Sequence, residues 1–221
     1  MRKIFPSLLS ANPLRLETEI KQLWSLSAGF HLDVMDYHFA PNLALGSNVV
    51  NAIAKLVPEG LCVHLMVTNP HGVLALLDLP VKTTVSFHYE SFAADAERVT
   101  FITELKNRGL RPSIALSPET PVAVLCPNLI AQVDHILIMS VKPGFSGQTF
   151  IPETVNKVRE LALYAKTHAL TVTIAGDGGI NRNNIKALED AGMCEFAVAS
   201  AIFGSTDPVA TLSHISGQNE L

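Results

Sequence analysis

Eight short apolar segments alternate with longer amphipathic segments along this 221-residue chain. The apolar segments predict strands near residues 3–8, 29–35, 61–66, 83–88, 111–116, 134–140, 171–176 and 195–199. The amphipathic segments predict helices near residues 12–26, 46–57, 70–78, 93–108, 120–126, 152–168, 181–191 and 207–216. This alternation is typical of parallel strands joined by right-handed helical crossovers.

Eight such units favour a single (β/α)8 TIM barrel, with one domain over residues 1–221. The high hydrophobic fraction, 48%, fits a parallel sheet covered by helices. Asn12-Pro13, Asn69-Pro70 and Asp207-Pro208 each place a capping residue before proline and predict helix starts. An open, doubly wound sheet remains the alternative from the pattern alone.

Composition and charge argue against several classes of partner and cofactor. The net charge of −4, without a basic stripe, excludes a nucleic-acid partner, and no apolar run is long enough for a membrane span. The N-terminus lacks the apolar core of a secretory signal, and Cys62, Cys126 and Cys194 form no CxxC pair. We therefore expect a reduced, cytoplasmic protein. No predicted strand is followed by GxGxxG, so a dinucleotide is not expected.

A polar pair interrupts the second predicted strand. His31 and Asp33 alternate with Leu32 and Val34, so both polar side chains point to the same face. If that face is the barrel interior, a divalent cation would satisfy both. His64 on the next strand and Asp177 after the seventh complete a mixed nitrogen and oxygen set suited to one zinc, iron(II), manganese or cobalt ion. Each residue alone also fits an ordinary core or turn position.

Two later loops are candidates for binding phosphate. Gly178-Gly179 follows the seventh predicted strand and Ala199-Ser200 follows the eighth, where barrels often bind phosphate. Residues 143–148 follow the sixth strand and carry two glycines, which is consistent with a mobile lid. Either glycine-rich segment could also be a simple turn.

The chain resembles the ribulose-phosphate 3-epimerase family. The resemblance runs from residue 6 to residue 204 and is carried by PSLLSA at 6–11, HLDVMDYHFAPN at 31–42, HLM at 64–66, MSVKPGFSGQ at 139–148, FIP at 150–152 and DGGI at 177–180. It implies a barrel enzyme that inverts C3 of a ketose phosphate, most simply D-ribulose 5-phosphate to D-xylulose 5-phosphate. It also implies a sugar-phosphate partner and a homo-oligomer.

The resemblance assigns roles to individual residues. It implies that His31, Asp33, His64 and Asp177 are the metal ligands and that Asp33 and Asp177 are the acid/base pair. Epimerisation needs two such groups, one on each side of the carbon. Substrate and phosphate contacts are expected from Ser7, His64, Met66, Gly144, Phe145, Ser146, Gly147, Gly178, Gly179, Ala199 and Ser200. Met35 and Met139, with Met66, are expected to line the pocket, although methionine is also ordinary core filling.

The sequence departs from the family pattern at a few positions. Tyr37, Ser146 and Ala199 replace usual glycines, and Ala175-Gly176 stands where the family usually has Glu-Val. If position 37 needs a positive φ, tyrosine there is strained. These departures leave two alternatives: 3-epimerisation of another ketose phosphate such as D-allulose 6-phosphate, or a non-catalytic sugar-phosphate binding protein.

Overall fold

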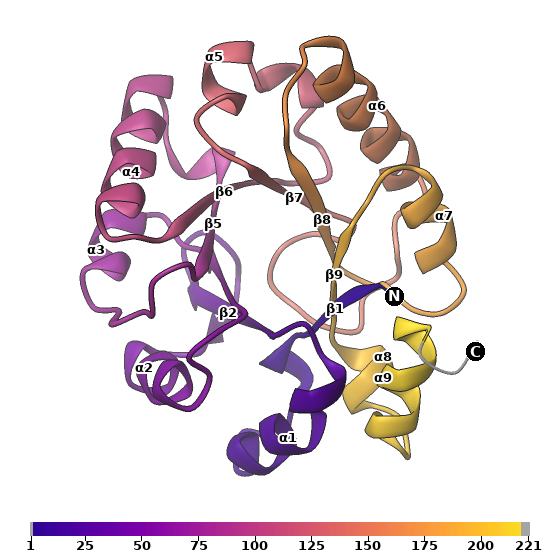
Figure 1. The fold of residues 1–221 in the computed structure, drawn as a ribbon. Coiled ribbons are helices and arrows are strands. Elements are labelled where there is room, and N and C mark those ends of the chain that lie inside the picture. Colours follow the sequence, from indigo (N-terminus) through magenta and orange to yellow (C-terminus); the bar gives the residue numbers. More distant parts are fainter. Residues whose placement is uncertain (1, 218–221) are drawn as a thin grey trace.

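The computed structural model describes residues 2–217 and shows a closed barrel of parallel strands surrounded by helices (Figure 1). The parallel strands are β1 (Lys3–Pro6), β2 (Phe30–Asp36), β4 (Leu61–Met66), β5 (Thr84–His88), β6 (Arg111–Leu116), β7 (His135–Met139), β8 (Thr173–Asp177) and β9 (Glu195–Val198). They pair in chain order, β9 pairs with β1, and a bridge between Ser7 and His31 joins β1 to β2. The predicted barrel is confirmed and the open sheet is wrong. Residues 1 and 218–221 of the predicted domain lie outside the described residues.

Helices cover the outside of the barrel (Figure 1). They are α1 (Leu16–Leu23), α2 (Ser47–Leu56), α3 (Pro70–Leu74), α4 (Asp95–Asn107), α5 (Pro127–Ile130), α6 (Thr154–Thr167), α7 (Ile185–Asp190), α8 (Ser200–Phe203) and α9 (Pro208–Ser216). Short 3-10 turns are η1 (Leu8–Ser10), η2 (Trp24–Leu26), η3 (Tyr89–Ser91) and η4 (Val122–Val124). Within residues 2–217, no helix has the length and apolar content needed to cross a lipid bilayer.

Strand alternation separates an apolar outer core from a mixed interior. On β2, Phe30, Leu32 and Val34 belong to the large buried cluster that the helices complete. His31 and Asp33 point the other way, and β4 repeats the pattern with Leu61, Val63 and Leu65 outside. The register pairs Asp33 with His64, so the two strands deliver their polar side chains at the same level.

Two helix predictions needed correction. The helix expected from residue 12 begins at Leu16, because the Asn12 side chain accepts a hydrogen bond from the Leu14 N–H and forms a separate turn. The helix expected over 120–126 is the turn η4 followed by α5, which starts at Pro127. Proline has no N–H and disfavours helix at the preceding residue, so the segment restarts there. The two-residue strand β3 (Leu43–Ala44), antiparallel to β2, was not predicted.

The other two proline-marked helix starts are as expected. The Asn69 side chain accepts from the Gly72 N–H at 3.0 Å, and the Asp207 side chain accepts from the Ala210 N–H at 2.9 Å. Each satisfies an N–H that has no partner within its helix. The helix that follows each strand therefore begins at a defined point, which fixes the loops at the carboxyl ends of the strands.

Candidate metal and substrate site

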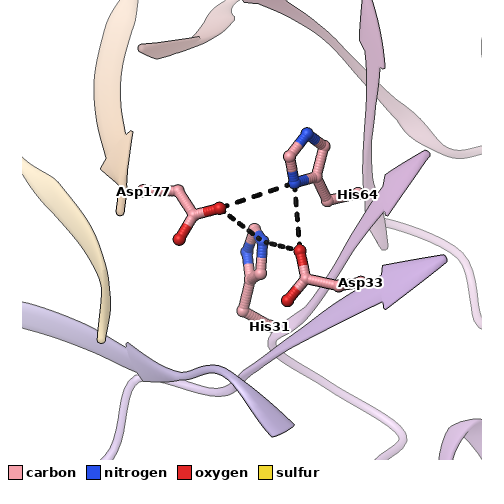
Figure 2. Close-up of side chains that lie close together, drawn as sticks. All are labelled: His31, Asp33, His64 and Asp177. Atoms are coloured by element: carbon pink, nitrogen blue, oxygen red, sulfur yellow. Dashed lines mark hydrogen bonds and ion pairs between the residues drawn. The ribbon is translucent and has the colours of Figure 1, made fainter. Parts of the chain in front are cut away.

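Four side chains converge at the carboxyl end of the barrel (Figure 2). His64 Nδ1 lies 3.1 Å from Asp33 Oδ1 and 3.6 Å from Asp177 Oδ2. His31 Nε2 lies 3.3 Å from Asp33 Oδ1 and 3.8 Å from Asp177 Oδ2. The two histidines and Asp33 are buried, while Asp177 is partly open to the cavity above. The four residues that the sequence singled out are therefore neighbours in space.

The cluster has the chemistry and spacing of a divalent-cation site. His31 Nε2 is buried and has no hydrogen-bond partner, which is costly unless its lone pair or its hydrogen is satisfied in another way. Four ligand atoms about 2.1 Å from a common tetrahedral centre would lie about 3.4 Å apart. The four nitrogen–oxygen distances run from 3.1 to 3.8 Å, and all four ligand atoms lie within 4.8 Å of one another. These residues fit a cation held by two nitrogens and two oxygens.

The two carboxylates of the cluster favour positive charge beside them. Burial alone would raise the pKa of Asp33, but the neighbouring imidazoles of His31 and His64 outweigh it and lower the pKa. Burial opposes a charge on His64, yet hydrogen bonds with Asp177 and Asp33 raise the pKa of His64 to about 9. The potential that retains this proton would also attract a metal ion, whose own charge favours the ionised carboxylates.

Ser7 supports the carboxylate of Asp33, and Ser140 supports the backbone that carries Asp177. The Ser7 hydroxyl donates to Asp33 Oδ2 at 2.7 Å, which leaves Oδ1 for the histidines. The Ser140 hydroxyl donates to the backbone oxygens of Asp177 and Gly178, at 2.9 and 2.6 Å. Ser7 was expected to contact substrate, and in this structure its hydroxyl is used by Asp33. Ser140 was not anticipated, although it directly follows an inward-facing strand residue.

A cavity opens above Asp33 and Asp177. Its walls include every other residue that the sequence predicted for the site except the two histidines beneath: Ser7, Met35, Met66, Met139, Gly144, Phe145, Ser146, Gly147, Gly178, Gly179, Ala199 and Ser200. Leu9, Val141, Lys142, Pro143, Ile180 and Ala197 complete the lining. Met35 and Met66, on neighbouring strands, belong to one apolar cluster, and Met139 on β7 belongs to another.

Gly178 and Gly179 adopt conformations that a side chain would strain. Their φ angles are +111° and +61°. A Cβ on Gly178 would lie 2.4 Å from Val141 Cγ2, and one on Gly179 would lie 2.9 Å from the Phe150 nitrogen. Glycine is therefore required for this loop to pass beneath its neighbour. Ser200, the first residue of α8 after the neighbouring strand β9, also lines the cavity.

The loop over residues 142–149 is closed over the cavity. Its Gly144 oxygen accepts from Asn42 Nδ2 at 2.7 Å, and Ser146 Oγ lies 2.5 Å from Ser10 Oγ. The loops after β1 and β2 thus hold it down. The free volume left beneath is about 30 Å³, enough for a few water molecules.

Tyr37 has a positive φ, the strained backbone conformation considered for this position from the sequence. Its φ is +67°, inside the tight turn that Asp36 organises by accepting from the N–H groups of His38 and Phe39. Together with bonds from the Thr68 N–H and hydroxyl, these bonds outweigh the effect of burial and lower the pKa of Asp36 to about 2. The ring of Tyr37 is 64% exposed and does not line the cavity. Its influence on substrate choice is therefore indirect at most.

Two neighbours of the cluster were not anticipated from the sequence. His88 is fully buried beside His64, with the Nε2 atoms 2.9 Å apart, and its Nδ1 lies 3.1 Å from Glu90 Oε2. Burial, only partly offset by the bond to Glu90, lowers the pKa of His88 to about 4. A signal was present, because His88 alternates with Phe87 on a predicted strand just as His64 alternates with Leu65.

Comparisons with known proteins agree with this geometry. Residues 3–203 match the model of the ribulose-phosphate 3 epimerase family. The cytoplasmic isoform of ribulose-phosphate 3-epimerase from Oryza sativa subsp. japonica is 36% identical over 214 residues, covering 96% of this chain and 91% of the relative. Ribulose-phosphate 3-epimerase from Bacillus subtilis strain 168 is 32% identical over 219 residues, covering 98% and 99%.

Solved structures with the same architecture are more distant in sequence. A ligand complex of KGPDC from Streptococcus mutans superposes with a TM-score of 0.70 at 12% identity, covering 97% of this chain and 95% of that one. A 3-hexulose-6-phosphate synthase gives a TM-score of 0.68 at 15% identity, covering 98% and 99%. At these identities the likeness concerns the fold.

Proposed function

From the premise that the chain belongs to the ribulose-phosphate 3-epimerase family and is a carbohydrate isomerase, we propose that it interconverts D-ribulose 5-phosphate and D-xylulose 5-phosphate. The observation that carries the proposal is the pair of carboxylates from β2 and β8, Asp33 and Asp177, at the floor of one cavity. Inversion at C3 needs a proton removed from one face and another delivered to the opposite face. Two carboxylates from well-separated strands meet that requirement.

Each aspartate has a defined part in the proposed reaction. In one direction Asp33 takes the C3 proton as a carboxylate while Asp177, protonated, returns one to the other face; the roles exchange in reverse. The Ser7 hydroxyl keeps Asp33 in place, since it donates to Oδ2 at 2.7 Å. Met35, Met66 and Met139 keep water from the reacting carbon.

We propose one divalent cation, zinc, iron(II), manganese or cobalt, held by His31, Asp33, His64 and Asp177. When bound, the ion supplies positive charge that stabilises the negative charge of an enediolate. The orphaned Nε2 of His31 supports this ligand set.

The phosphate is proposed to bind at the far wall of the cavity. Backbone N–H groups of Gly178, Gly179 and Ala199 and the Ser200 hydroxyl are the donors there, with the 144–147 segment closing from above. Because only about 30 Å³ is free beneath the closed loop, the 142–149 segment opens to admit substrate.

The setting of the enzyme is part of the proposal. The resemblance to the family supports a homo-oligomer, and the rice relative, a cytoplasmic isoform, supports a cytoplasmic location. Light scattering on the purified protein would give the mass of the assembly, and a monomer at micromolar concentration would contradict the oligomer.

The decisive experiment compares two substrates, using enzyme whose metal content has been determined. Ribulose 5-phosphate and allulose 6-phosphate are assayed side by side, with solvent-deuterium incorporation at C3 followed by NMR. We expect the larger kcat/KM for the pentulose. A larger value for the hexulose would support the alternative epimerase, and tight binding of either sugar without deuterium incorporation would support a binding protein.

A further inference from the structure

His64 has two ring nitrogens with different neighbours. Nδ1 faces Asp33 and Asp177, at 3.1 and 3.6 Å, and is the atom available to a cation. Nε2 lies 2.9 Å from Nε2 of His88. Two ring nitrogens at that separation share one hydrogen, so one of them donates and the other accepts. Which one donates decides whether His64 can bind a cation at all.

The hydrogen-bond partner of His88 Nδ1 determines which of the two Nε2 atoms donates. His88 Nδ1 lies 3.1 Å from Glu90 Oε2, and a carboxylate can only accept. His88 Nδ1 therefore carries the hydrogen, and Nε2 of the neutral ring accepts from His64. His64 in turn carries a hydrogen on Nε2. Its Nδ1, 3.1 Å from Asp33 Oδ1, then carries only the hydrogen that a bound cation would replace. The hydrogen bonds that run from Glu90 through His88 to Nε2 of His64 agree with this one pattern, and the Ser117 hydroxyl, 3.3 Å from His88 Nδ1, can accept the same hydrogen.

Glu90 is itself fixed by two donors. Its Oε1 accepts from the Ser117 N–H at 3.0 Å and from the Thr120 hydroxyl. Both donors belong to the loop after β6, while Glu90 belongs to η3 after β5. The carboxylate is thus oriented by a different loop from its own, with Oε2 left to face His88.

Packing prevents the rings from turning. His64 and His88 are fully buried and stack with ring centroids 5.0 Å apart and planes at 29°. Phe39 covers the other side of His88 with its centroid 4.5 Å away. A rotation of either ring would break the Nε2–Nε2 bond without a replacement partner, because buried polar atoms have no water to turn to.

We propose that His88 and Glu90 are positioning residues that fix the tautomer and orientation of His64, so that Nδ1 is presented to the divalent cation. The inference rests on the metal centre proposed above and extends it to a relay, Glu90–His88–His64. Partners of this kind orient metal-ligating histidines, and their loss costs about 10–100-fold in metal affinity or activity.

Glu90→Gln gives the sharpest test because it is isosteric and only partly buried. The two donors at Oε1 retain the amide oxygen there, so the amide NH2 faces His88 Nδ1 and donates. The relay then reverses: His88 Nε2 carries the hydrogen and His64 Nε2 accepts. Nδ1 of His64 then holds the only hydrogen of a neutral ring, so a cation can bind there only if the reversed relay is broken. His88→Leu removes the acceptor, and His88→Gln restores one through its side-chain oxygen.

Cobalt and zinc affinities are measured by competition with a chromophoric chelator, together with the visible spectrum of the cobalt-loaded protein. We expect affinity to fall about 10–100-fold in Glu90→Gln and His88→Leu, with an altered cobalt spectrum, and to recover in His88→Gln. His135→Leu is the matched control, since His135 is another buried, carboxylate-paired histidine that makes no hydrogen bond to the cluster. Circular dichroism confirms folding.

The outcomes separate the two proposals. If the wild type holds one cation and Glu90→Gln binds it equally tightly with an unchanged cobalt spectrum, the relay is wrong and the metal centre stands. If the wild type holds no stoichiometric cation, the metal centre and the relay both fall. Should His88→Leu not fold, Glu90→Gln alone carries the test. An equal loss in His135→Leu would reduce the effect to general destabilisation and overturn the relay.

Discussion

The two ends of the barrel interior both bury histidine with carboxylate, but they do so differently. At the amino end, where the parallel strands begin, His135 Nε2 donates to Glu195 and His135 Nδ1 accepts from Ser113 at 2.7 Å. Ser113 accepts from Ser86 in turn, and Lys3 and Arg111 lie 3.4 and 3.9 Å from Glu195. Each polar atom there has a partner within the protein.

At the carboxyl end, one buried polar atom is left without a hydrogen bond. His31 Nε2 has no hydrogen-bond partner, and its distances to the two aspartates, 3.3 and 3.8 Å, are long. A buried network that is only partly satisfied costs stability, and one that is fully satisfied adds rigidity. The contrast teaches that burial and residue type alone do not mark a functional site. What marks it is a polar cluster that the protein leaves incomplete.

The largest expected difference between the ends is catalytic. Asp33→Asn and Asp177→Asn should each lower kcat/KM by about 10²–10⁴-fold, because each removes one of the two proton-transfer groups. Asp134→Asn makes the same substitution at the amino end, on an exposed carboxylate paired with Arg111, and should change kcat/KM by less than about twofold. Initial rates with the ketopentose phosphate measure all three. Near-normal turnover in either of the first two variants would remove that aspartate from the mechanism.

Part of this contrast was readable from the sequence. Period-two alternation around His31 and Asp33 indicated the inward face, and the order of strands and helices indicated the barrel. The start of α1 and the division of the 120–126 segment depended on local turns at Asn12 and Pro127 that compete with helix. The contact between His64 and His88 depends on how adjacent strands stagger around the barrel, which no local pattern encodes. The closed amino-end network was missed for the same reason.

Metal removal should affect only the carboxyl end. A cation at about 1,000 times its dissociation constant stabilises the folded state by about 4 kcal/mol. We therefore expect the Tm of the chelated wild type to rise on adding cobalt or zinc, and His31→Gln to lose most of that rise. Glu195→Gln, altered at the other end, should retain it. A rise of equal size in His31→Gln would place the cation elsewhere.

Stability should depend more on the amino end. Glu195→Gln leaves His135, Lys3 and Arg111 without their shared carboxylate, and should lower the free energy of unfolding by about 3 kcal/mol. The kcat of the folded fraction should not change, since Glu195 does not line the substrate cavity. Urea unfolding and active-site-normalised rates measure the two quantities. An unaltered unfolding midpoint would mean that the amino-end network does not stabilise the fold. That result would contradict the structural role assigned to this end of the barrel.

The smallest effect concerns the pH dependence of that same network. Burial, partly offset by the bond to Glu195, lowers the pKa of His135, so the unfolded chain binds a proton on His135 at a pH where the native protein does not. Stability linked to this residue is complete above about pH 6.5 and declines as the pH falls toward the native pKa, by up to about 1.4 kcal/mol per pH unit. His135→Gln should remove this slope between about pH 6.5 and 5.5, as urea unfolding at each pH would measure. His168→Gln, at an exposed histidine after α6, should leave the slope as in the wild type. If His135→Gln keeps the wild-type slope, the neutral, fully bonded histidine assigned to the amino end is wrong.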